Sequence, residues 1–132
     1  MKNKFLETGE HGYHPLRKFI IILSGLRFAV LHDFSVLYKI IVSIVILIPA
    51  IIYKEWIDVS LIILATGVMI AAEVFNTAIE AICDFMETRY NEKIKIIKDI
   101  AAAAAGITIF TWVAVLIIEL IKVIPRITFL VI

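Results

Sequence analysis

Three apolar stretches, each long enough to cross a lipid bilayer, constrain this chain more than any other feature of its sequence. They cover residues 34–53, 59–82 and 100–121. A helix needs about 20 apolar residues to span a hydrocarbon core roughly 30 Å thick. Hydrophobic residues make up 62% of the 132-residue chain and charged residues only 19%, which leaves too few polar residues to cover a small soluble domain. The sequence therefore predicts an all-α membrane protein with three transmembrane helices in a single domain, residues 1–132.

The segment before the first apolar stretch predicts a helix on the membrane surface. Residues 1–14 are polar and are expected to form a tail, and Pro15 suits the first turn of a helix over 15–33. Arg17 and Arg27 recur at helical spacing between apolar residues. This pattern is typical of an amphipathic helix that lies in the interface rather than across the bilayer.

Lysine and arginine residues are distributed unequally between the two sides of the predicted membrane. Three spans place the N-terminal region and the segment 84–99 on one side, and the turn 54–58 and the C-terminal end on the other. Lys39, near the start of the first span, is expected to snorkel to the headgroups of the first side. Ten basic residues then fall on the first side and three on the other, so the positive-inside rule predicts a cytoplasmic N-terminus.

Polar side chains inside the second apolar stretch mark a candidate functional site. Glu73, Asn76, Thr77, Glu80 and Asp84 fall within an arc of roughly 100° when this segment is drawn as a helix. A charged group that faces lipid costs a few kcal/mol, so this face must meet other helices, water or a bound cation. Hydrogen bonds between helices would be a sufficient reason for the amide of Asn76 and the hydroxyl of Thr77, if these two stood by themselves. The three carboxylates repel one another unless something positive joins them, which favours a functional role.

The depth of each carboxylate suggests a different task. A carboxylate near the interface can bind Mg²⁺, which prefers one or two carboxylates together with phosphate oxygens and water. A deeper, desolvated carboxylate is a candidate general base. Asp33, at the end of the predicted surface helix, could add a second metal ligand. Lys98 and Asp99, at the start of the third span, could meet a nucleotide, or could be only an interfacial anchor and a match to the helix dipole.

Other common sites are absent from the sequence. The chain has no Gly-rich phosphate loop and no zinc-binding pattern of His and Cys. The net charge of +1 argues against a nucleic-acid-binding protein. The run 101–105 of alanines, followed by Gly106, is typical of close helix packing in membranes.

The run Glu73-Val-Phe-Asn-Thr-Ala-Ile-Glu-Ala-Ile-Cys-Asp84, followed by Lys98-Asp99 and an Ala-rich helix, resembles the signature of the bacterial (prokaryotic-type) diacylglycerol kinase family. That family of small integral-membrane lipid kinases includes the undecaprenol kinases. The sequence Gly25-Leu-Arg27 is similar to part of the family's N-terminal helix. The resemblance extends over residues 14–125.

The resemblance implies a homotrimer with active sites shared between subunits, ATP as co-substrate and Mg²⁺ as cofactor. By position, Glu73 would be the general base for the lipid hydroxyl, with Asn76 beside it, and Glu80 and Asp33 would be metal ligands. Glu73 and Ala102 would contact the lipid substrate. The remaining matched positions would line the nucleotide site: His14, Arg17, Arg89, Tyr90, Asn91, Lys98 and Asp99.

Two positions depart from the family pattern. Asp33 stands where the family usually has a metal-binding glutamate, so its carboxylate reaches one methylene less far. His14 stands where many members have a nucleotide-contacting arginine, and Arg17, one turn later, could take over that contact.

The expected activity is ATP- and Mg²⁺-dependent phosphorylation of diacylglycerol to phosphatidic acid at the cytoplasmic face of the bacterial inner membrane. Undecaprenol is an alternative substrate, because nothing in the motif distinguishes the two alcohols. A non-catalytic membrane protein of the same fold is a second alternative. A proton or cation carrier is a weaker one, because residues 59–72 offer only Ser60 and Thr66 as polar groups beyond Glu73.

Overall fold

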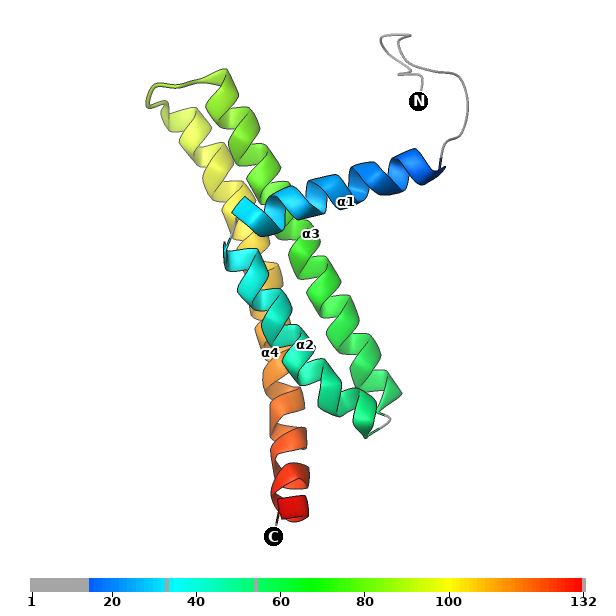
Figure 1. Cartoon of the computed structure of the whole chain (residues 1–132). Coiled ribbons are helices and arrows are strands. Elements are labelled where there is room, and N and C mark those ends of the chain that lie inside the picture. The colour runs from blue at the N-terminus through cyan, green and yellow to red at the C-terminus, as the bar shows by residue number, and fades with distance from the viewer. Residues whose placement is uncertain (1–14, 33, 54, 132) are drawn as a thin grey trace.

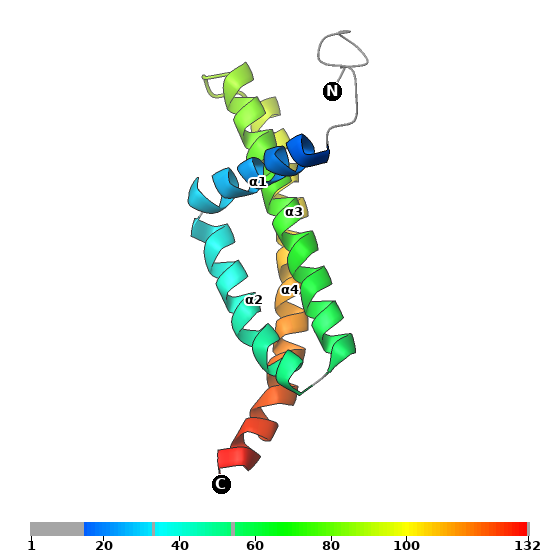
Figure 2. The ribbon, with the colours of Figure 1, turned by 45° about the vertical axis from the view of Figure 1, so that its right-hand side comes forward.

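The chain forms four helices in the computed structural model, which describes residues 15–32, 34–53 and 55–131. They are α1 (Pro15–His32), α2 (Phe34–Ile52), α3 (Trp56–Met86) and α4 (Glu92–Val131). Figure 1 shows α2, α3 and α4 running alongside one another, with α1 crossing them at a steep angle. The view in Figure 2 shows the same arrangement, with the α3–α4 connection and the end of α4 at opposite ends of the molecule.

Three of these helices, α2, α3 and α4, are long and apolar enough to cross a membrane. This confirms the prediction of an all-α chain with three candidate spans. Their exposed surfaces carry large apolar side chains, such as Ile63, Leu64 and Phe110, as expected where lipid replaces water as the solvent. The position of α1 on the membrane surface stays a prediction.

Helices α3 and α4 continue beyond the apolar stretches that predicted them. With 31 residues, α3 is about 46 Å long at 1.5 Å per residue, which exceeds the hydrocarbon thickness of roughly 30 Å. Its last turns, and the first turns of α4, carry charged residues such as Asp84, Lys93 and Lys98. The two helices therefore project their polar ends together on the side of the connection 87–91.

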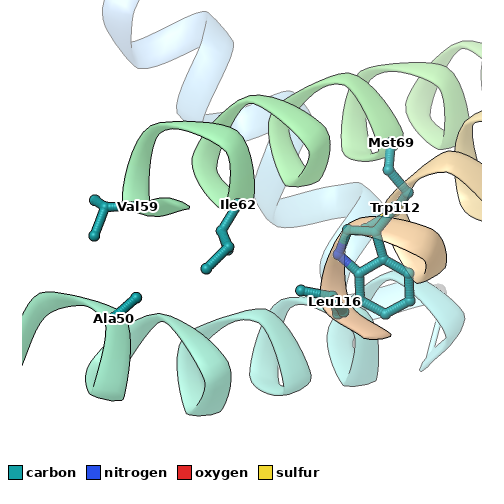
Figure 3. Close-up of a cluster of buried hydrophobic side chains, with 6 residues drawn as sticks. All are labelled: Ala50, Val59, Ile62, Met69, Trp112 and Leu116. Atoms are coloured by element: carbon teal, nitrogen blue, oxygen red, sulfur yellow. The ribbon is translucent and has the colours of Figure 1, made fainter. Parts of the chain in front are cut away.

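The core of the bundle lies between α2, α3 and α4 (Figure 3). Its buried members are Ala50 from α2, Val59, Ile62 and Met69 from α3, and Trp112 and Leu116 from α4. Because each of the three helices contributes to one contiguous apolar cluster, their mutual register is fixed at the centre of the bundle.

A second group of charged side chains lies at the opposite end from the α3–α4 connection. We call Asp58, Glu119 and Lys122 the far-end cluster. Asp58 and Glu119 are buried, and the Lys122 ammonium donates to both carboxylates, at 2.8 Å to Asp58 and 3.2 Å to Glu119. The cluster joins the first turn of α3 to α4 and leaves neither carboxylate without a cationic partner.

Candidate active site

The polar residues of α3 lie on one helical face, as their spacing predicts. Positions three and four apart are neighbours on a helix surface, and residues 73–84 are continuous helix. The Thr77 hydroxyl donates to the backbone carbonyl of Glu73 at 3.1 Å, so Thr77 is partnered within its own helix. Glu73, Asn76, Glu80 and Asp84 are left as the groups available for contacts outside α3.

Asn76 has one polar atom satisfied and one unsatisfied. Its Nδ2 donates to Glu80 Oε1 at 2.8 Å, which fixes the direction of the amide. Its Oδ1 is buried and accepts no hydrogen bond from the part of the chain that the structure describes. A buried acceptor without a donor costs about 1–3 kcal/mol. This oxygen is therefore suited to receive a hydrogen bond from a ligand.

Glu73 is buried and forms an ion pair with Lys39 of α2. The glutamate is 7% exposed and the lysine 3% exposed, and the ammonium donates both to Glu73 Oε1 and to Ser35 Oγ. The prediction that Lys39 snorkels to the headgroups is wrong. A carboxylate on the facing helix offers the ammonium a charged partner inside the bundle, and that contact draws the side chain inward rather than outward.

One turn further along α2, a layer of hydrogen bonds joins three helices. The Ser43 hydroxyl donates to the backbone carbonyl of Lys39 at 2.9 Å. It accepts hydrogen bonds from Thr66 Oγ1 of α3 at 3.0 Å and from Trp112 Nε1 of α4 at 2.8 Å. These three bonds use the full capacity of a hydroxyl group, and they hold α2, α3 and α4 in fixed positions next to the Lys39–Glu73 pair.

At the polar ends of α3 and α4, Lys98 forms an ion pair with Asp84. The ammonium donates to Asp84 Oδ1 at 2.5 Å, and the two side chains are 32% and 68% exposed. Glu80 lies near enough to interact electrostatically with the same ammonium. Asp99, the next residue along α4, is exposed. Exposed ion pairs of this kind are weak, so their charges remain accessible to a ligand.

Asn91, predicted as a nucleotide contact, caps the N-terminus of α4. Its Oδ1 accepts a hydrogen bond from the backbone N–H of Lys93 at 3.0 Å, which is the preferred role of asparagine at this position. Its neighbours Arg89 and Tyr90 are exposed in the connection. A short polar side chain immediately before a helix is the sequence signal for such a cap.

Replacement of Asn91 by alanine should destabilise the first turn of α4 by about 1 kcal/mol, because a backbone donor loses its acceptor. We expect faster amide hydrogen exchange at Lys93, measured on the purified protein in detergent. Asn91→Asp keeps an acceptor at the same place and should exchange like the wild type. Equal protection of Lys93 in the alanine variant would contradict the capping role.

The structure brings some of the predicted site residues together and separates others. Glu73, Asn76 and Glu80 share a face, which leads towards the Asp84–Lys98 pair. Arg17 is exposed on α1 and Ala102 is exposed on α4. The predicted residues His14 and Asp33 lie outside the described residues.

A magnesium ion is compatible with the donor chemistry at Glu80. Residues 15–32, 34–53 and 55–131 contain no group of three His, Cys, Asp or Glu side chains that could hold a metal on its own. Mg²⁺ does not require such a group, since one or two carboxylates with phosphate oxygens and waters suffice. Glu80 is half-buried, and it supplies one hard oxygen ligand of this kind.

Comparison with known proteins connects this geometry to a family. The family model described as prokaryotic diacylglycerol kinase matches residues 21–120, which include all of α2 and α3 and the whole polar face. No curated protein and no solved structure matches the chain significantly. The family match, together with three candidate membrane spans, identifies a multi-pass membrane protein. The chain belongs to the prokaryotic diacylglycerol kinase family.

Proposed function

We propose that this protein is a lipid kinase, which transfers the γ-phosphoryl group of ATP to the hydroxyl of diacylglycerol and forms phosphatidic acid and ADP. One observation carries the proposal. A single face of α3 presents a buried carboxylate, an unsatisfied amide oxygen and a second carboxylate, in that order towards the charged ends of α3 and α4. Phosphoryl transfer depends mainly on positioning and charge stabilisation, which a set of this size can supply.

In this proposal Glu73 accepts the proton of the lipid hydroxyl. The hydroxyl oxygen attacks the γ-phosphorus while the bond from that phosphorus to the bridging oxygen breaks, and ADP leaves with the electron pair. The unsatisfied Oδ1 of Asn76 is a hydrogen-bond acceptor that can hold the hydroxyl before its proton passes to Glu73. A general base contributes about 10²–10⁴-fold to a rate.

Glu80 is the residue that we assign to Mg²⁺, with Asp33 as a second proposed ligand. The bound ion would neutralise charge on the phosphate oxygens of ATP. The hydrogen bond from Asn76 to Glu80 orients the carboxylate and links it to the residue beside the base. Asn76, which would hold the lipid hydroxyl, and Glu80, which would bind the metal, are thereby in direct contact one helical turn apart.

The nucleotide is proposed to bind at the polar ends of α3 and α4. Lys98 supplies a cation for phosphate oxygens, and Asp99 lies next to it. The other proposed nucleotide contacts are Arg89, Tyr90 and Asn91 in the connection, and His14 and Arg17 before and within α1. Because the Oδ1 of Asn91 caps α4, its side chain has the Nδ2 group and one lone pair of Oδ1 left for a nucleotide.

Apolar grooves along α3 favour a lipid as the substrate. One groove, of about 420 Å³, lies between α1 and α3 and includes Leu26, Val74 and Phe75. Val74 and Phe75 lie at about the depth of Glu73 but on other faces of α3, and Ala102 is a further proposed lipid contact. An acyl chain and an isoprenoid chain would both suit such a surface, so undecaprenol is the alternative substrate.

The assembly and orientation belong to the same proposal. We propose a homotrimer with active sites shared between subunits, and the exposed apolar faces of α2, α3 and α4 can accommodate helices as well as lipid. The excess of basic residues beside α1 and the α3–α4 connection favours their placement on the cytoplasmic side of the bacterial inner membrane.

The carrier alternative receives little support from the bundle. Polar contacts continue beyond Glu73 to Ser43 and Thr66. The apolar core residues Ile62 and Leu116 then separate this layer from the far-end cluster. A continuous polar route across the described bundle is therefore interrupted.

The substrate can be identified with purified protein in mixed micelles. Diacylglycerol and undecaprenol are offered separately with ATP labelled in its γ-phosphoryl group, with and without Mg²⁺. We expect Mg²⁺-dependent labelling of diacylglycerol. If only undecaprenol is labelled, undecaprenol is the substrate and the proposed phosphoryl transfer stands. If the folded protein labels neither lipid, the result favours the non-catalytic alternative.

A further inference from the structure

Lys39 is a buried cation that has no role in the reaction proposed above. Its ammonium is held by Ser35 Oγ at 2.6 Å and by Glu73 Oε1, and the side chain is almost wholly shielded from solvent. The group that it contacts on α3 is the carboxylate proposed as the general base. A charge in direct contact with the base influences every step in which the base changes its own charge.

The position of Lys39 is set by direct contacts from α2 and α3, and α4 supports it through Ser43. Ser43 donates to its backbone carbonyl and is itself held by Thr66 and Trp112. The Lys39 side chain therefore extends to Glu73 from a segment of α2 that is fixed by hydrogen bonds from α3 and α4 to Ser43.

The ion pair balances the charge of Glu73 and leaves one of its oxygens open. A charged group that is buried without a partner is costly, because it loses its hydration. The Lys39 ammonium offsets the charge of the carboxylate, and its hydrogen bond engages Oε1, so that Oε2 would be the oxygen that receives the proton of the lipid hydroxyl.

We propose that Lys39 is a positioning residue, whose ammonium balances the charge of the Glu73 carboxylate and fixes its orientation towards the lipid hydroxyl. This inference rests on the proposed function, in which Glu73 is the base. It gives α2 a role in the reaction, because Lys39 supplies a cation next to Glu73 and the polar face of α3 contains none.

The first test compares two replacements of Lys39 in the full-length protein. Lys39→Gln keeps a hydrogen-bond donor and removes the charge, and we expect kcat for lipid phosphorylation to fall about 100-fold. The KM for ATP should stay within about twofold, because the nucleotide residues are elsewhere. Lys39→Arg keeps the charge and should retain about a tenth or more of the wild-type kcat.

The second test asks whether Lys39 acts through Glu73. In a Glu73→Gln background, the further change Lys39→Gln should alter the residual turnover by less than about twofold, because two residues that work as a unit are not additive. The double variant contains neither buried charge, so it suits measurement even if Lys39→Gln alone folds poorly. If Lys39→Gln lowered kcat by the same factor in the Glu73→Gln background as in the wild type, the proposal would be overturned.

A matched control is Lys122→Gln, which removes the ammonium that holds two buried carboxylates of the far-end cluster. The folded variant should keep kcat within about twofold of the wild type. Equal losses of kcat in Lys39→Gln and Lys39→Arg, or full activity of folded Lys39→Gln, would overturn the proposed role of Lys39. Either result would leave the proposed lipid kinase activity standing. A folded wild-type protein that transfers no phosphate to any lipid would overturn the proposed function and this inference together.

Discussion

Replacement of Glu73 by glutamine is expected to lower kcat for lipid phosphorylation by about 10²–10⁴-fold, because the amide cannot accept the hydroxyl proton. The KM for ATP should change little, since the interaction lost is one made with the reacting hydroxyl. The measurement is steady-state transfer of labelled phosphate in mixed micelles, with the lipid and ATP varied in turn.

The same substitution also removes the charge that balances Lys39. Loss of one member of a buried ion pair costs about 3–5 kcal/mol of stability, so the amount of folded protein must be measured by gel filtration and thermal unfolding. Glu119→Gln is the matched control. Glu119 is also a buried glutamate paired with a lysine, at the far end of the bundle, and its replacement should leave kcat within about twofold of the wild type. Equal losses in the two variants would show that Glu73 matters only for folding.

Glu80→Gln is expected to lower turnover about 100-fold at fixed Mg²⁺, because a charged ligand for the metal is lost. The glutamine oxygen can still accept the Asn76 amide that Glu80 Oε1 accepts, so the local hydrogen bond should survive. We expect the Mg²⁺ concentration for half-maximal activity to rise, and activity to recover in part at high Mg²⁺. The experiment is a Mg²⁺ titration of phosphate transfer for both proteins.

Glu87→Gln serves as the control for Glu80. Glu87 lies in the α3–α4 connection, and its Oε1 accepts the backbone N–H of Arg89, a bond that glutamine can also make. This variant should follow the wild-type Mg²⁺ titration. A Glu80→Gln protein with an unchanged Mg²⁺ requirement would contradict the assignment of Glu80 to the metal.

The three spans and the polar face were predictable because each depends on one helix at a time. The length of an apolar stretch is fixed by bilayer thickness, and a period of 3.6 residues fixes which side chains share a face. Glu73, Asn76 and Glu80 meet both conditions, so their arrangement on α3 follows from their spacing. The start of α4 at Glu92 was missed, because a helix can begin in polar, helix-favouring residues ahead of its apolar stretch. The extra turns of α3 and the C-terminal end of α4 were missed because bilayer thickness limits the expected span and not the length of the helix.

The partner of Glu73 was not predicted, because it depends on the register between two helices. Periodicity within α3 does not say which residue of α2 lies opposite. A signal was nevertheless present in α2, where Ser35, Lys39 and Ser43 recur every four residues and so share one face. A polar face inside an apolar span avoids lipid, and in the structure this face of α2 meets Glu73 and Thr66 of α3.

The central claim is tested most directly by giving the purified wild-type protein γ-labelled ATP and Mg²⁺ with a total lipid extract of bacterial membranes, in parallel with Glu73→Gln. The extract offers every membrane alcohol at once, so the result does not depend on the choice of substrate. The account predicts a labelled phospholipid product from the wild type and loss of nearly all of that label with Glu73→Gln. No labelled lipid from folded wild-type protein, or equal labelling by both proteins, would contradict it.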